Sequence, residues 1–101
     1  MFKSTPNGFH ITFPNGLRLS TQFGFGNYCQ NRDDFDKSIL RSKGMINIDS
    51  KDCEVAIFGP NDEWLTDRYL TSIGKPEDMV IGYVDQDQWF KIFDWCRNYV
   101  E

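Results

Sequence analysis

The C-terminal stretch MVIGYVDQDQWFKIFDWCRNYVE, residues 79–101, decides the fold, because a short apolar strand runs directly into an amphipathic helix. Asp85 is suited to be the N-cap of that helix, since its carboxylate can accept hydrogen bonds from first-turn amides. Gln88 lies three residues further on and completes the pattern of a capping box. The sequence therefore predicts a helix that begins at Gln86.

The apolar side chains of this helix fall on one side of it. At about 100° per residue they occupy a stripe of roughly 120°, which is typical of a surface helix buried along one face. The stripe consists of Trp89, Ile92, Phe93, Cys96, Tyr99 and Val100. Phe90 and Trp95 flank it on opposite sides, and they fit either packing against sheet edges and loops or an exposed partner site.

The N-terminal part of the chain predicts a β-hairpin. Residues 9–13 and 17–25 alternate between apolar and polar side chains, as half-buried strands do. A two-residue turn would pair apolar with polar side chains, whereas a three-residue loop opened by Pro14 and closed by a left-handed Gly16 aligns both apolar faces. In that register Ile11 lies opposite Leu19, and His10 lies opposite Ser20 on the outer face.

The middle of the chain adds further elements. Residues 53–58 predict a strand, residues 64–66 its hairpin partner, residues 67–74 a continuation or a turn, and residues 45–48 a brief edge strand. Asp33 could cap a helix that runs to Ser42 and ends at Gly44, with a long ordered loop as the alternative. The whole chain, 1–101, is expected to be a single α+β domain, in which a mostly antiparallel sheet of about four to five strands carries the C-terminal helix on one face.

Composition narrows the class of protein. A hydrophobic content of 40% and 16% aromatic residues indicate a globular chain. No apolar run approaches the ~20 residues of a membrane span, and no secretory signal is evident, so a cytoplasmic location is expected. The net charge of −4 disfavours nucleic-acid binding. Three widely spaced cysteines indicate reduced thiols rather than a disulfide framework.

No catalytic or cofactor motif emerges. His10 is the only histidine, no nucleophile elbow accompanies it, and no Cys-x-x-Cys pair suggests zinc. Gly24 and Gly26 follow a strand, but the lysine and the further glycine of a phosphate loop are missing. We therefore expect no enzyme activity, no metal and no cofactor, although carboxylate chemistry among the 15 acidic residues remains an alternative.

Residues 11–32, ITFPNGLRLSTQFGFGNYCQNR, resemble the opening of small accessory proteins encoded by tailed bacteriophages. Residues 54–57, 64–66 and 80–84 are similar in character. The resemblance implies a phage protein that acts inside an infected bacterial cell. Proteins of this kind often inhibit host defence systems, including CRISPR, through protein contacts or by sequestering a signal molecule.

These observations favour a non-enzymatic interaction protein, an anti-CRISPR-like or other anti-defence inhibitor that contacts a host protein. Aromatic and arginine side chains supply most of the energy of such interfaces, so Tyr28, Arg32, Trp64 and Trp95 are the expected binding residues. One alternative is a protein that sequesters a nucleotide-type signal in the loop of residues 24–32, with Arg32 facing the anion. A virion accessory protein is a further alternative. The sequence predicts neither a membrane partner nor an oligomeric state.

Overall fold

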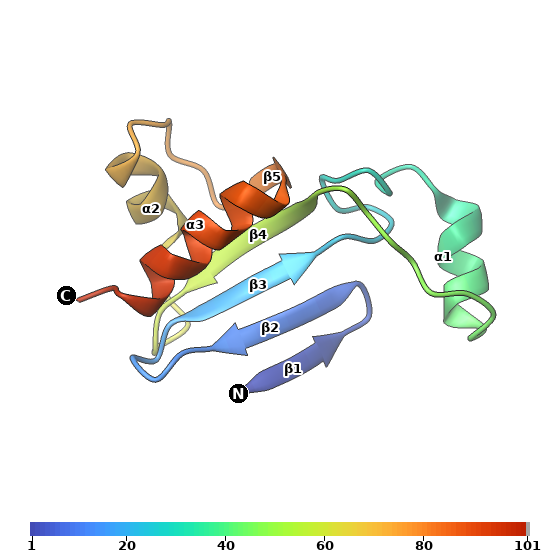
Figure 1. The fold of residues 1–101 in the computed structure, drawn as a ribbon, viewed down its shortest axis with the longest axis horizontal. Helices are drawn as coiled ribbons and strands as arrows, with labels where there is room; N and C mark the ends of the chain where they lie inside the picture. The colour runs from blue at the N-terminus through green and yellow to red at the C-terminus, as the bar shows by residue number, and fades with distance from the viewer. Residues whose placement is uncertain (101) are drawn as a thin grey trace.

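A computed structural model describes residues 1–100, which form one five-stranded antiparallel sheet and three helices (Figure 1). The strands are β1 (Phe2–Thr5), β2 (Gly8–Thr12), β3 (Arg18–Gln22), β4 (Cys53–Phe58) and β5 (Ile81–Val84). The helices are α1 (Phe35–Ser42), α2 (Thr66–Ser72) and α3 (Gln86–Arg97). Neighbouring strands follow chain order from β1 to β5, which confirms the α+β class with the C-terminal helix on one face of an antiparallel sheet.

The β2–β3 hairpin has the register that the sequence predicts. Ile11 pairs with Leu19 and His10 pairs with Ser20. The amide of Gly16 donates to the carbonyl of Phe13 at 2.9 Å, and Gly16 has φ of 89°, a conformation that glycine adopts without steric penalty. A three-residue loop thus aligns the apolar faces of both strands.

Helix α3 starts and packs as predicted. The Asp85 carboxylate accepts from the amide of Gln88 at 2.9 Å, and the Gln88 side chain accepts from the amide of Asp85 at 3.0 Å, which completes the capping box. Ile92 and Cys96 are buried against the sheet. Val100 lies beyond the end of the helix and is exposed, so the buried stripe is shorter than the sequence pattern indicates.

The hydrophobic core lies between the sheet and the helices α2 and α3. Its largest fully buried side chains include Leu19 of β3, Ile57 of β4 and Ile92 of α3. At the far end of α3, the Asn15 side chain donates to the carbonyl of Cys96 at 2.8 Å, so the hairpin loop satisfies a helix-end carbonyl. In Figure 1, α3 crosses the sheet over β3 and β4, whereas β1 and β2 extend beyond it.

Residues 64–66, expected as the hairpin partner of β4, pair with it only at their start, and residues 67–74, expected as a continuation of that strand or a turn, lie mostly in α2. Trp64 makes only an isolated bridge to Phe58, and Thr66 begins α2. The buried Thr66 hydroxyl accepts from the amide of Ile57 at 2.9 Å, and thereby takes the place of a neighbouring strand's carbonyl. The Thr66 side chain thus supplies a hydrogen-bond acceptor to the edge of β4. The backbone that follows can therefore form a helix instead of a strand.

Three further expectations change. Asp34, not Asp33, caps α1, although the helix ends ahead of Gly44 as predicted, and Gly44 is in a left-handed conformation. Residues 45–48 form no strand. The strand expected at residues 17–25 ends at Gln22, and the strand β1 was not anticipated because its sequence FKST lacks an apolar alternation.

Replacing Asp85 with Ala should lower the free energy of unfolding by about 1 kcal/mol, because the substitution removes the side-chain acceptor for the Gln88 amide. Urea denaturation measures this change. The control, Asp85→Asn, keeps an oxygen acceptor and should differ little from the parent. Equal losses in both variants would show that the cap contributes through its charge rather than through its hydrogen bond.

Candidate functional site

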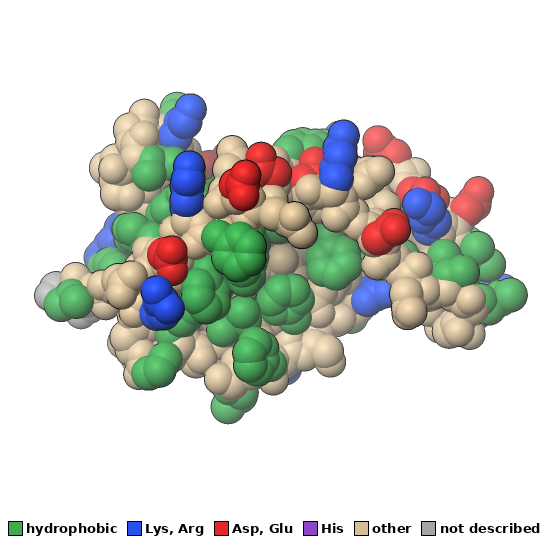
Figure 2. Space-filling view, in the orientation of Figure 1, with side chains coloured by type: hydrophobic (Ala, Val, Ile, Leu, Met, Phe, Trp, Pro, Cys, Tyr) green, Lys and Arg blue, Asp and Glu red, His purple; other side chains and the backbone are tan. Residues whose placement is uncertain are grey.

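Aromatic side chains remain accessible where α3 leaves the sheet uncovered. Phe9 of β2, Phe23 just after β3, and Trp89 and Phe90 of α3 form what we call the aromatic face. Phe90 is 60% exposed, and the other three are partly buried. Figure 2 shows hydrophobic side chains gathered in the middle of this side of the molecule, with charged side chains along the margin above them.

The aromatic face surrounds an open cavity of about 330 Å³. Thr21, Cys53 and Val84 contribute to it from the sheet. Its rim is polar and is made of Ser50, Lys51, Asp52, Asp85 and Gln86. An apolar hollow with a few polar groups at its edge is the usual form of a binding site.

Trp89 fixes the shape of this cavity. Its indole nitrogen donates to the hydroxyl of Thr21 at 2.9 Å, which joins α3 to β3. The ring of Phe9 meets the Trp89 ring edge-on at 6.3 Å, and the ring of Phe90 does so at 5.4 Å. The indole therefore has a hydrogen-bond partner within the protein, and its neighbouring rings present mainly apolar surface to a ligand.

The carboxylates at the rim are engaged within the protein. Asp52 accepts from the amide of Gln30 at 2.6 Å, and Asp85 caps α3. One oxygen of each carboxylate, Oδ1, accepts this bond, so both groups position backbone segments. The walls between these rim groups are mainly apolar.

The reactive side chains do not meet at this site. Burial raises the pKa of Cys53 and of Cys96 to about 12, so both thiols are protonated at neutral pH. The pKa of Cys29 is also raised, chiefly by burial. His10 pairs with Ser20 on the opposite face of the sheet from Cys53, and its pKa is lowered by burial and by the charges of Arg18 and Lys3. Within residues 1–100, Cys53 and His10 therefore do not form a nucleophile–base pair.

The structure brings Tyr28 and Arg32 together. The guanidinium of Arg32 lies 5.1 Å from the centre of the Tyr28 ring, and both residues are exposed. Tyr28 also contacts Gly82, where an added Cβ would lie 2.8 Å from the Tyr28 Cβ. The predicted pair therefore forms a small stacked unit at the β5 edge of the sheet.

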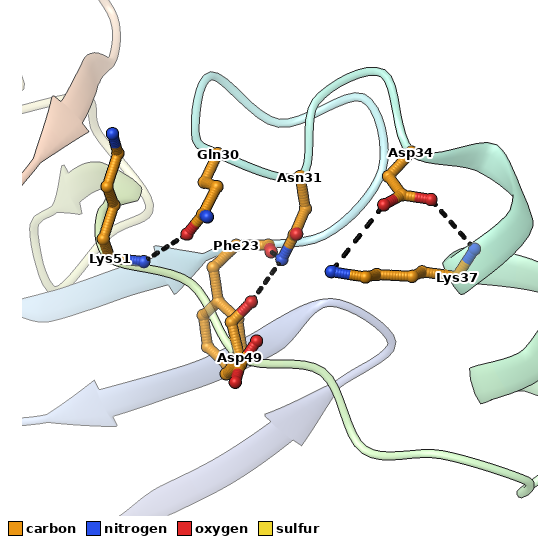
Figure 3. Close-up of polar contacts among 7 residues, drawn as sticks. All are labelled: Phe23, Gln30, Asn31, Asp34, Lys37, Asp49 and Lys51. Carbon is orange, nitrogen blue, oxygen red and sulfur yellow. Dashed lines mark hydrogen bonds and ion pairs between the residues drawn. The ribbon is translucent and has the colours of Figure 1, made fainter.

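The loop that carries this pair is held in place by its polar side chains (Figure 3). Asn31 is buried, and its side chain donates to the carbonyls of Phe23 and Asp49, each at 2.8 Å. The Gln30 side chain accepts from the amide of Lys51 at 2.8 Å. These bonds join the loop to the segment before β4 and fix Tyr28 and Arg32 relative to the sheet.

Trp64 and Trp95 belong to other ring clusters. Trp64 packs on Phe58 at 4.5 Å and is 44% exposed. Trp95 is partly buried against the core, with Tyr69 at 5.5 Å and Tyr99 at 4.9 Å. The four residues expected to bind a partner thus occupy three separate places.

The sequence does not single out the aromatic face. The alternation of residues 9–13 places Phe9 on the apolar face of its strand, and the helical pattern leaves Phe90 outside the buried stripe of its helix. Those two signals could have indicated a site, but they are 81 positions apart, and only the packing of α3 on the sheet unites them.

Comparison with known proteins assigns no family: no family model matches the chain, and neither a curated protein nor a solved structure is similar to it. Within residues 1–100, three or more His, Cys, Asp or Glu side chains do not gather anywhere as a metal site would require. None of the helices in this part of the chain has the length and apolar character needed to cross a membrane.

Alanine substitutions should show that Trp95 contributes more to the stability of the fold than Trp64 does. Trp95→Ala is expected to lower the free energy of unfolding by about 2–3 kcal/mol, because the ring packs against the core and two tyrosines. Trp64→Ala removes a more exposed ring and should lower it by about 1 kcal/mol. Equilibrium denaturation compares the two. A stable Trp95→Ala variant would instead assign Trp95 to a binding surface.

Proposed function

We propose that this protein is a non-enzymatic interaction protein that binds another protein through the aromatic face. The observation that carries the proposal is the exposure of Phe90 beside an apolar cavity on the half-covered side of the sheet. A partner side chain that fills the cavity would be removed from water together with the Phe90 ring. Burying an aromatic side chain of this size stabilises a complex by about 1.5–3 kcal/mol.

The resemblance of residues 11–32 to phage accessory proteins supports a more specific form of the proposal. In that form the partner is a bacterial host protein, and the phage protein inhibits a defence system or a metabolic enzyme by covering part of its surface. The raised thiol pKa values and the separation of His10 from Cys53 favour action by contact over catalysis.

A second candidate is the binding of a small apolar molecule. The cavity volume of about 330 Å³ lies at the lower end of the range of about 300–1,000 Å³ for ligand pockets. Its aromatic walls suit an apolar ligand better than a nucleotide. The loop of residues 24–32 offers less to an anion, because the hollow beside it is lined by Asp33, Asp34 and Asp36.

The test is affinity capture from bacterial lysate with three tagged proteins: the parent, Phe90→Ser and Phe35→Ser. Phe35 is a matched control, since it is 55% exposed and lies on α1, away from the aromatic face. The proposal predicts a host protein, identified by mass spectrometry, that the parent and Phe35→Ser retain in equal amounts and that Phe90→Ser retains poorly.

Thermal denaturation of all three proteins checks that neither substitution unfolds the chain. Equal retention by Phe90→Ser and the parent would contradict the proposed surface. Recovery of a bound small molecule with no protein would favour the second candidate.

A further inference from the structure

The two edges of the sheet differ in how their backbone groups are used. At the β5 edge, the amide of Tyr83 donates to the carbonyl of Tyr28 at 2.9 Å. Tyr83 has φ of 53°, and the pairing of β4 with β5 is interrupted by a register shift. The loop that carries Tyr28 therefore covers this edge, and the irregular backbone disfavours a further strand.

The opposite edge, β1, is open. Met1 and Thr12 exchange two backbone bonds, of 2.9 and 3.1 Å, so they form a hydrogen-bonded pair at the end of the β1–β2 ladder. Such pairs alternate along antiparallel strands, which directs the amide and carbonyl groups of Lys3 toward β2. The amides and carbonyls of Phe2 and Ser4 consequently point away from the sheet, and both residues are exposed.

The two faces of β1 have different chemistry. Phe2 lies opposite Ile11, and its side chain, 82% exposed, continues the apolar surface on the α3 side of the sheet. Lys3 lies opposite His10 on the other face, which also carries Arg18. In Figure 1, β1 lies at the margin of the sheet, on the side that α3 leaves uncovered.

Charge argues against a second copy of the chain at this edge. The fullest antiparallel pairing of two β1 strands sets Phe2 opposite Ser4 of the second copy, and Lys3 then faces Lys3. Like charges directly opposite destabilise a strand pair, and an exposed lysine is a common guard against self-association. A segment with an acidic residue at that position would meet Lys3 with opposite charge.

We propose that β1 accepts an extended segment of a partner protein as a sixth strand, with an acidic residue opposite Lys3 and apolar residues on the side of Phe2. This inference rests on the proposed function as an interaction protein and names the form of the partner. Main-chain bonds to Phe2 and Ser4 would hold the segment, and the alternation of its side chains would select it.

The probe is the peptide acetyl-Ser-Ile-Glu-Ile-Ser-amide, compared with the same peptide in which Lys replaces Glu. Titration is followed by backbone amide NMR and by hydrogen exchange. We expect the amides of Phe2 and Ser4 to shift and to exchange more slowly. The Glu peptide should bind several-fold more tightly than the Lys peptide, and Lys3→Glu should reverse that order.

Ser4→Pro removes the outward amide while leaving the inward bonds of Lys3 and Thr5 in place, and Ser4→Thr is the control that keeps it. We expect Ser4→Pro to lose peptide binding and Ser4→Thr to retain it. Equal binding by these two variants would overturn the proposal. So would an absence of shifts at Phe2 and Ser4 up to the solubility limit of the peptide, or an unchanged order of peptides in Lys3→Glu.

The experiment distinguishes this inference from the proposed function. Phe90→Ser alters the aromatic face but not the backbone of β1, so it should still bind the peptide. If the peptide fails to bind while a host protein is retained in a Phe90-dependent manner, only the sixth strand is excluded. If the peptide binds and no host protein is retained, the edge remains a binding site and the aromatic face does not.

Discussion

The structure depends on how one helix is attached to a wider sheet. An α-helix with its side chains is about 10 Å wide, whereas five strands at about 4.8 Å spacing extend over about 19 Å. Helix α3 is held over β3 by the bond from Trp89 to Thr21 at one end and by the bond from Asn15 to the Cys96 carbonyl at the other. With α2 contacting β4, the β1–β2 half of the same face has no helix over it.

This arrangement explains why apolar surface remains accessible. The β2–β3 register places Phe9 and Ile11 on the same face of the sheet as the core. Helix α3 is nevertheless too narrow to cover β1 and β2 as well as β4. The open edge of β1 adjoins the same uncovered half of the sheet. The aromatic face and the edge are therefore neighbouring consequences of one packing geometry, and together they supply the apolar contact and the backbone groups that a protein partner uses.

Local sequence signals predicted the elements that are stabilised locally. The capping box of Asp85 and Gln88 and the turn of Pro14 and Gly16 act within a few residues, and the structure confirms both. Two elements without a clear pattern of side chains were missed: α2 starts where the Thr66 hydroxyl bonds to Ile57 of β4, and the four-residue strand β1 pairs with β2 although its sequence lacks an apolar alternation. The candidate site was missed for a different reason, because Phe9 and Phe90 are far apart in the sequence and line one cavity only after α3 packs on the sheet. Tyr28 and Arg32 were each selected from the sequence without a predicted contact, and the structure stacks them because they belong to one short loop.

Paramagnetic relaxation by a soluble gadolinium chelate can measure whether half of the sheet is uncovered in solution. With assigned side-chain NMR signals, an uncovered half predicts strong relaxation of Phe90, intermediate relaxation of Phe9 and Ile11, and little effect on the buried Ile57 and Ile92. Protection of Phe9, Ile11 and Phe90 to the level of Ile92 would contradict the account, because it would mean that another segment or a second copy covers this face in solution.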